Sequence, residues 1–248
     1  KDILNINGDF TLEFWVYIQG TGSRPIASGG EIQSSGWQIT FESSTGKIIY
    51  NQNQGGNNIN LASQNQVDVD LWHHVAIAGV GDSVTLFIDG QSEQSKQGHQ
   101  SFGRFGGSVK IGGGSGSTPQ GIADYFVGFI QDFRFFQSFG FYKHNFNPPS
   151  ELLYSCAEDP INPDCSNVMV HVQTRFDDIY LYDRSGKYNS IRSFGDVIID
   201  QDSYLSHGAS ILFGEDKSSK INITSGNRSD FELKDSEDFT IETFINWG

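Results

Sequence analysis

Residues 8–16 decide the fold, and they read Gly8-Asp9-Phe10-Thr11-Leu12-Glu13-Phe14-Trp15-Val16. From Phe10 to Ile18 every second residue is apolar, whereas Thr11, Glu13 and Gln19 of the other parity are polar. Alternation with a period of two predicts a half-buried β-strand. We therefore expect a strand over residues 10–18 whose even-numbered side chains face a core.

The same pattern returns near the end of the chain as Glu237-Asp238-Phe239-Thr240-Ile241-Glu242-Thr243-Phe244-Ile245. The interval is far longer than solenoid repeats, which run to roughly 50 residues, so it predicts large tandem modules. Thr243 stands where the first copy has Phe14, which predicts different packing in the second module. Since the chain lacks an initial Met and stops just past the second copy, we expect a piece of a longer protein.

Composition narrows the class of protein. The 29 glycines and the aromatic content of 13% favour short strands joined by tight turns. A net charge of -14 opposes binding to nucleic acid or to an anionic membrane surface, since both require a basic face. No run of about 18 apolar residues exists, so we expect no membrane insertion.

Turn and strand signals divide the chain further. Residues 37–42 alternate, residues 43–46 form a hairpin turn, and Asp89-Gly90 gives the strongest short hairpin signal. Residues 20–36 and 51–66 are rich in Gly, Pro, Asn or Gln and are predicted to be loops. The remaining predicted strands are 47–51, 71–78, 83–88, 109–112, 128–136, 168–172, 179–183, 188–191, 210–213 and 220–224.

Four motifs in this order and spacing resemble the laminin-G-like, concanavalin-A-like jelly-roll family: residues 9–16, 72–76, 86–90 and 128–134. The resemblance covers about residues 1–149, and residues 168–248 resemble the N-terminal portion of the same module. It implies an all-β antiparallel sandwich of two sheets. The expected domains are 1–149, which lacks its N-terminal strands, a linker at 150–167, and part of a second module at 168–248. Because 168–248 repeat the strand that 1–149 already has, we expect that they do not fill its gap.

The end of the first module carries a narrower resemblance. It resembles the C-terminal end of such modules in structural proteins of tailed bacteriophages. The resemblance rests on residues 129–134 and on residues 141–149, which include Asn145-Phe146-Asn147-Pro148-Pro149. This implies a structural and adhesion module of a tail fibre, appendage or capsid-surface protein, located on a virion surface or outside the cell. Its partners would be other virion or assembly subunits and host-surface glycans. The alternative is a secreted or cell-surface bacterial adhesin with carbohydrate- or protein-binding sandwiches.

Catalysis is the third hypothesis, and the sequence argues against it. Glycoside hydrolases need two carboxylates across a sugar-binding groove, and the jelly-roll type carries a Glu-x-Asp-x-(x)-Glu run that this chain lacks. Glu13 and its counterpart Glu242 indicate a repeated structural contact. His73 and His74 are adjacent on a predicted strand, so they point to opposite faces and cannot easily chelate one ion. We therefore expect a protein that is not an enzyme.

Other candidate sites follow from residue type. The resemblance makes calcium binding at a loop rim conceivable, with acidic solvation as the alternative. The acidic candidates are Asp68, Asp70, Asp82, Asp124, Asp200 and Asp202. Carbohydrate or partner contacts are assigned to aromatic residues, since sugars stack on rings and aromatic residues gather at interfaces. They are Trp15, Tyr17, Phe136, Phe139, Phe141 and Tyr142.

The only two cysteines, Cys156 and Cys165, flank a short Pro-containing loop in the predicted linker. A disulfide closing this loop would indicate an oxidising environment. Two free thiols in a linker are the alternative.

Overall fold

The computed structural model describes residues 8–33, 35–54, 57–98, 109–114, 125–149, 168–174, 180–186, 189–204, 209–216 and 218–224. All regular structure within these ranges is β. The strands are β1 (Phe10–Ile18), β2 (Arg24–Glu31), β3 (Ser35–Glu42), β4 (Lys47–Gln54), β5 (Asn57–Ala62), β6 (Trp72–Val80), β7 (Ser83–Ile88), β8 (Gln91–Gln97), β9 (Val109–Ile111), β10 (Gly128–Gln137), β11 (Val168–Gln173), β12 (Tyr182–Asp183), β13 (Ser190–Phe194), β14 (Val197–Asp200), β15 (Ser210–Phe213) and β16 (Lys220–Thr224).

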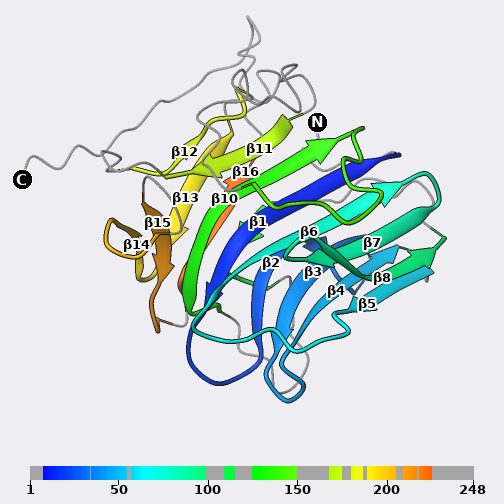
Figure 1. Ribbon diagram of the computed structural model, residues 1–248. Helices are drawn as coiled ribbons and strands as arrows, with labels where there is room; N and C mark the ends of the chain where they lie inside the picture. The colour runs from blue at the N-terminus through cyan, green and yellow to red at the C-terminus, as the bar shows by residue number, and fades with distance from the viewer. Residues whose placement is uncertain are drawn as a thin grey trace, which may run out of the picture.

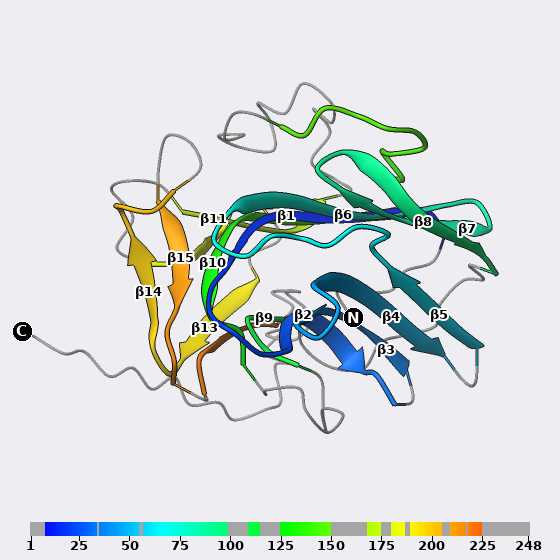
Figure 2. The ribbon, with the colours of Figure 1, turned by 60° about the horizontal axis from the view of Figure 1, so that its bottom comes forward.

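Two sheets pack face to face (Figures 1 and 2). A nine-stranded sheet has the order β12-β11-β10-β1-β6-β7-β8, with β15 also paired to β10 and β14 paired to β15. A seven-stranded sheet has the order β13-β16-β9-β2-β3-β4-β5. The expected all-β antiparallel sandwich is therefore confirmed.

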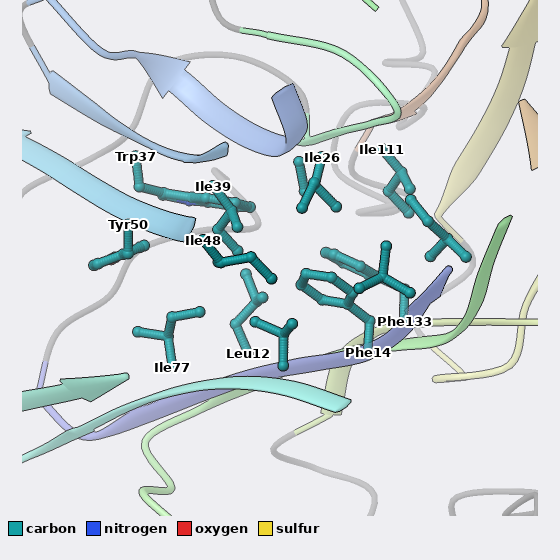
Figure 3. Close-up of a cluster of buried hydrophobic side chains, with 14 of the residues drawn as sticks. Leu12, Phe14, Ile26, Trp37, Ile39, Ile48, Tyr50, Ile77, Ile111 and Phe133 are labelled. Carbon is teal, nitrogen blue, oxygen red and sulfur yellow. The ribbon is translucent and has the colours of Figure 1, made fainter. Parts of the chain in front are cut away.

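The strand β1 lies at the centre of the nine-stranded sheet, antiparallel to both β6 and β10. Its bounds are those expected from the sequence, and its even-numbered side chains are all buried. Figure 3 shows Leu12 and Phe14 among core residues of both sheets, including Trp37, Ile39 and Ile48. Burying a side chain of this size stabilises the fold by about 1.5–3 kcal/mol, so β1 anchors the core.

Both predicted hairpin turns are present. Asp89 and Gly90 have φ values of 50° and 75° between β7 and β8, as a type I′ turn requires. Residues 43–46 connect β3 and β4, and the Thr45 N–H donates to the Glu42 carbonyl.

The prediction of loops at residues 20–36 and 51–66 is wrong, because β2, all of β5 and the end of β4 lie there. Pro25 is accommodated at a register shift between Pro25 and Ala27. Gly36 is required by packing, since a Cβ atom there would lie 2.7 Å from the Gly29 carbonyl oxygen. In β5, Ile59 and Leu61 alternate into the core, so apolar parity outweighs the loop-like Asn and Gln content.

The described strands after residue 167 belong to the same sandwich. β11 and β15 pair with β10, and β16 pairs with β9, so both sheets continue without interruption. The described strands of 168–224 cover the edges of β9 and β10 with apolar side chains. The expectation that residues 168–248 do not fill the gap in the first module stays a prediction. The division into two tandem modules stays a prediction, and the second copy of the repeated strand lies outside the described residues.

Within the described ranges, we find no apolar helix of membrane-spanning length.

Candidate functional site

The outer face of the nine-stranded sheet carries the odd-numbered side chains of β1. Thr11 and Glu13 are almost completely buried, at 0% and 2% exposure, although they point away from the core. Trp15 and Tyr17, two and four residues further along, are partly exposed. The outer face is therefore covered at one end and open at the other.

Residues 139–149, which we call the strap, cover the first end. The Phe141 N–H donates to Thr11 Oγ1 at 3.0 Å, and the Phe146 N–H donates to the Gly90 carbonyl at 2.9 Å. The approach at Gly90 is so close that a Cβ atom there would lie 1.9 Å from the Phe146 carbonyl oxygen. The glycine of the β7–β8 turn thus serves both the turn and the docking of the strap.

Aromatic rings attach the strap to the sheet. Tyr142 and Phe146 stack with ring centroids 3.6 Å apart and planes 6° apart. Both rings pack against a small apolar cluster on the outer face, formed by Ala76, Ala78 and Phe87. The aromatic sequence at the end of the module is largely explained by this packing and by the core, which holds Phe133 and Phe135.

A buried charge cluster lies beneath the strap. Glu13 pairs with Arg134 at 2.8 Å and with His74 Nε2 at 3.4 Å, and it accepts a hydrogen bond from the Tyr142 hydroxyl at 2.7 Å. Burial alone would raise the pKa of Glu13, but Arg134, His74 and Tyr142 outweigh it and lower this pKa to about 2. Glu13 is therefore held ionised, and the expectation of a structural contact at this residue is confirmed.

A second buried pair joins β10 to β11. Asp132 sits at a bulge in β10 with φ of 56°, and its Oδ1 lies 2.7 Å from His171 Nε2. Burial would raise the pKa of Asp132, but Arg134 and His171 outweigh it and lower the pKa. Glu13 and Asp132 each therefore lie within ion-pair distance of a buried basic side chain.

The two adjacent histidines contact different carboxylates, as their opposite orientations predict. His73 Nδ1 lies 2.8 Å from Asp89 Oδ2, and the hydrogen bond with Asp89 raises the pKa of His73. His74 faces Glu13 on the outer face of the sheet. The expectation that they do not share an ion is consistent with this geometry.

The open end of the outer face carries an aromatic row, which we define as Trp72 of β6, Tyr17 of β1 and Phe129 of β10. The three are register partners on adjacent strands. The Tyr17 ring lies 5.7 Å from Trp72 and 5.5 Å from Phe129, with edge-to-face geometry in both pairs. Trp72 and Tyr17 are partly exposed, so the row presents ring surface to solvent.

The row continues onto the C-terminal strands. Leu212 of β15 is the register partner of Phe129, and Ile198 of β14 is the register partner of Leu212. Ile198 is 51% exposed. An apolar stripe therefore crosses five strands, from β6 to β14, on one outer face.

The opposite outer face is polar. One side chain from each strand of the seven-stranded sheet forms a cross-strand row: Asn60, Asn51, Gln38, Ser28, Lys110, Asn222 and Arg192. The aromatic row and this polar row give the two faces of the sandwich different chemistry.

The structure separates the aromatic residues predicted as contacts. Trp15 and Tyr17 lie at the open end, as a contact role requires. Phe136 is 1% exposed and packs against Phe141, so it lies within the packed interior, and its role as a contact stays a prediction. Phe139 is exposed, whereas Phe141 and Tyr142 are partly buried in the strap.

Sequence reasoning missed Trp72 and Phe129. Both were counted only as parts of strand motifs, and only the register across β6, β1 and β10 brings them beside Tyr17. It also missed a group of exposed apolar side chains between residues 180 and 204. They are Tyr180, Tyr182, Phe194, Ile198 and Tyr204.

Two surface hollows were not predicted. One of about 360 Å³ lies over β7 and β8 beside the strap, lined by Val80, Ser83, Thr85, Ser92, Ser95, Tyr142 and Lys143. The other, of about 590 Å³, is lined by Tyr180, Leu181, Ile191, Ser193, Val197, Ile198, Ile199 and Gln201.

The acidic candidates for calcium that the structure describes do not converge on one site. Among the described residues, no group of three or more His, Cys, Asp or Glu side chains is arranged to hold a metal ion. Asp82 lies in the β6–β7 turn, and Asp200 Oδ1 accepts from the N–H groups of Asp202 and Ser203. Asp124, Cys156 and Cys165 lie outside the described residues.

A family model for the concanavalin A-like lectin/glucanases superfamily matches residues 1–139. Domains LG4-5 of the mouse laminin α1 chain are similar at 14% identity and a TM-score of 0.45, over 58% of this chain and 41% of that one. A candidate carbohydrate binding protein from Bacteroides ovatus is similar at 14% identity and a TM-score of 0.47, over 88% of this chain and 54% of that one.

The CBM40 module of a Ruminococcus gnavus sialidase is similar at 13% identity and a TM-score of 0.39, over 50% of this chain and 73% of that one. The chain spans about half the length of the laminin and Bacteroides structures. No curated protein matches the sequence. The family match over residues 1–139 indicates the fold class, and a function has to be inferred from the site.

Proposed function

The chain belongs to the concanavalin A-like lectin/glucanases superfamily, and from this premise we propose that it is a non-enzymatic module that binds carbohydrate through the aromatic row. The fold alone does not decide between binding, catalysis and a structural role, because this sandwich serves all three. The observation that carries the proposal is the row of Trp72, Tyr17 and Phe129 on the uncovered half of the sheet, in which Trp72 and Tyr17 are partly exposed and Phe129 is buried beside them.

Ring surface of this kind suits a sugar. Aromatic side chains combine a large apolar face with rigid geometry, and ligand sites pair such surfaces with a few polar groups. Asp70 supplies a polar group beside the row: it is exposed, and its N–H donates to the Ile18 carbonyl at the end of β1. A sugar stacked on Tyr17 or Trp72 would have this carboxylate nearby as a hydrogen-bond acceptor.

The electrostatics of the outer face support a non-enzymatic role. A glycosidase needs a carboxylic acid whose pKa is raised so that it can protonate the leaving group. Glu13 and Asp132 are buried in ion pairs, and the pKa of each is lowered. Neither carboxyl carries a proton to donate near neutral pH.

We extend the proposal to the biological setting, a structural and adhesion module of a phage virion protein that touches host-surface glycans. The resemblance of residues 129–149 to the close of phage modules supports it. The second setting is a secreted or cell-surface bacterial adhesin. The exposed apolar side chains at residues 180–204 support both settings, since exposed apolar patches mark interaction surfaces. Electron microscopy of the native assembly distinguishes the two.

The binding proposal is tested by glycan-array screening of the whole chain, followed by titration of the best oligosaccharide with the variants Trp72→Ala and Tyr17→Ala. Both variants should lose most of the affinity. Tyr180→Ala is the matched control, since Tyr180 is 65% exposed and lies outside the row. If Tyr180→Ala abolishes binding while both row variants retain it, the aromatic row is not the site. Release of reducing sugar from the bound glycan would contradict the non-enzymatic part.

A further inference from the structure

The strap leaves part of the outer face beside it open, over strands β7 and β8. A hollow of about 360 Å³ lies there, lined by Val80, Ser83, Thr85, Ser92, Ser95, Tyr142 and Lys143. Figure 2 shows the strap, in green, on the outer side of β6 and β8. A hollow of this volume falls within the range of roughly 300–1,000 Å³ that is typical of small-molecule sites. It is separate from the aromatic row, since no residue of the row lines it.

Hydroxyl groups line the hollow on the side of the sheet. Thr85 of β7 and Ser95 of β8 are register partners, and Ser83 shares their face because it lies two residues from Thr85. Thr85 Oγ1 donates to Ser95 Oγ at 3.0 Å, and the Ser83 and Ser95 hydroxyls are hydrogen-bonded at 2.7 Å. Each hydroxyl has one hydrogen and two lone pairs, so these two bonds leave one hydrogen and several lone pairs for a ligand. The set can both donate and accept, which suits the hydroxyls of a sugar.

Tyr142 gives the hollow an aromatic wall whose position is fixed. Its hydroxyl donates to Glu13 Oε2 at 2.7 Å, and Phe146 stacks on one face of its ring. Phe146 does not line the hollow, so the hollow borders the Tyr142 ring on another side. The strap also docks closely just before this ring, since a Cβ atom on Gly140 would lie 2.5 Å from the Gly79 carbonyl oxygen. The wall is therefore preorganised, which lowers the entropic cost of binding a ligand against it.

Lys143 gives the hollow a positive charge. It is exposed, and we find no hydrogen bond or ion pair between its ammonium group and any other described residue. Lys96 of β8, in contrast, donates from Nζ to the Asn58 carbonyl at 3.1 Å and does not line the hollow. None of the lining residues is acidic, although the chain carries a net charge of -14. The ammonium of Lys143 is thus positioned to attract an anionic group of a ligand.

We propose that this hollow binds a saccharide that carries a carboxylate, such as a uronic acid. The sugar ring packs against Tyr142, and the carboxylate pairs with Lys143. The sugar hydroxyls exchange hydrogen bonds with Ser83, Thr85 and Ser95. This is a second binding site on the outer face, with its own specificity, and it does not depend on binding at the aromatic row.

The test is an NMR titration of the isotope-labelled whole chain with D-glucuronate, D-glucose and acetate. We expect glucuronate to shift the amide signals of Ser92 and Ser95 with the lowest Kd. Glucose lacks the carboxylate and should bind about two- to fivefold more weakly, since an exposed ion pair contributes modestly. Acetate lacks the ring and the hydroxyls and should bind more weakly still. If glucuronate binds no better than glucose, or acetate binds as well as glucuronate, the proposal is overturned.

Two variants locate the site. Lys143→Gln should weaken glucuronate binding about two- to fivefold and leave glucose binding unchanged. Ser95→Ala removes the hydroxyl that joins the other two and should weaken the binding of both sugars. The matched control is Lys96→Gln, which removes an exposed ammonium outside the hollow and should bind glucuronate as the native chain does. Equal losses in Lys143→Gln and Lys96→Gln would indicate general charge attraction and would contradict a site in the hollow.

The same titration separates this site from the aromatic row. The amide signals of Tyr17 and Phe129 report on the row, whereas those of Ser92 and Ser95 report on the hollow. Glucuronate that shifts only the signals of the row would assign the acidic sugar to the row and overturn the proposal. Shifts at Ser92 and Ser95 that Lys143→Gln weakens support it, whether or not the row binds a glycan.

Discussion

The two halves of the outer face of the nine-stranded sheet share a strand and an alternation, yet they differ in environment. Thr11 and Glu13 lie under the strap and are buried, whereas Trp15 and Tyr17 remain partly exposed. Along β1, the outward side chains are polar in the covered half and aromatic in the open half. The difference teaches that parity along a strand predicts which face a residue occupies but not whether a later segment covers that face.

The largest expected effect is at the centre of the covered half. Glu13→Gln removes the buried negative charge that lies 2.8 Å from Arg134 and also faces His74. Breaking a buried pair in this way costs about 3–5 kcal/mol. Urea denaturation should show this loss in the free energy of unfolding. Glu215→Gln, at an exposed position, is the control and should change it little.

A pH series probes the same cluster without mutation. The pKa of Glu13 is lowered from 4.5 to about 2 in the folded protein. A lowered folded-state pKa contributes stability that is complete above pH 4.5 and is lost as the pH falls toward 2, amounting to about 3 kcal/mol. Unfolding free energies measured across this window should fall for the native chain and flatten in Glu13→Gln. An equal slope in both would refute the assignment.

The docking of the strap is tested at the β7–β8 turn. Gly90→Ala places a Cβ atom against the Phe146 carbonyl and also strains a backbone with φ of 75°. Strain and overpacking together should cost about 2–3 kcal/mol. Gly81→Ala is the control, because φ is 58° there but no atom lies within 4 Å of the added Cβ. Similar losses in both variants would mean that the strap does not restrict Gly90.

The smallest expected effect on stability is in the open half. Trp72→Ala removes a partly exposed ring and should cost about 1–2 kcal/mol, whereas Phe87→Ala, fully buried under the strap, should cost about 3–5 kcal/mol. Denaturation of both variants under the same conditions measures the two losses in the free energy of unfolding. A larger loss for Trp72→Ala than for Phe87→Ala would contradict the expectation that the open half contributes less to stability than the covered half.

Sequence patterns predicted the fold where alternation is regular. The β1 bounds and the Asp89-Gly90 turn agree with the structure, because parity and turn chemistry are local properties. The strands β2 and β5 were missed because Gly, Asn and Gln suggest loops; Ile59 and Leu61 of β5 alternate into the core, whereas in β2 the adjacent Ile26 and Ala27 are both buried at a register shift. The site needed information that is not local: Trp72, Tyr17 and Phe129 meet only through strand register, and the burial of Phe136 requires the strap.

The position of β1 between β6 and β10 has a consequence for biosynthesis. β6 begins at Trp72, after β2–β5, whereas β10 begins only at Gly128. At about 5–20 residues per second, the ribosome needs on the order of ten seconds to supply that second neighbour. During this delay one edge of the central strand has no partner and can pair with another nascent chain. Chaperone binding at residues 10–18 should therefore accompany synthesis until β10 emerges.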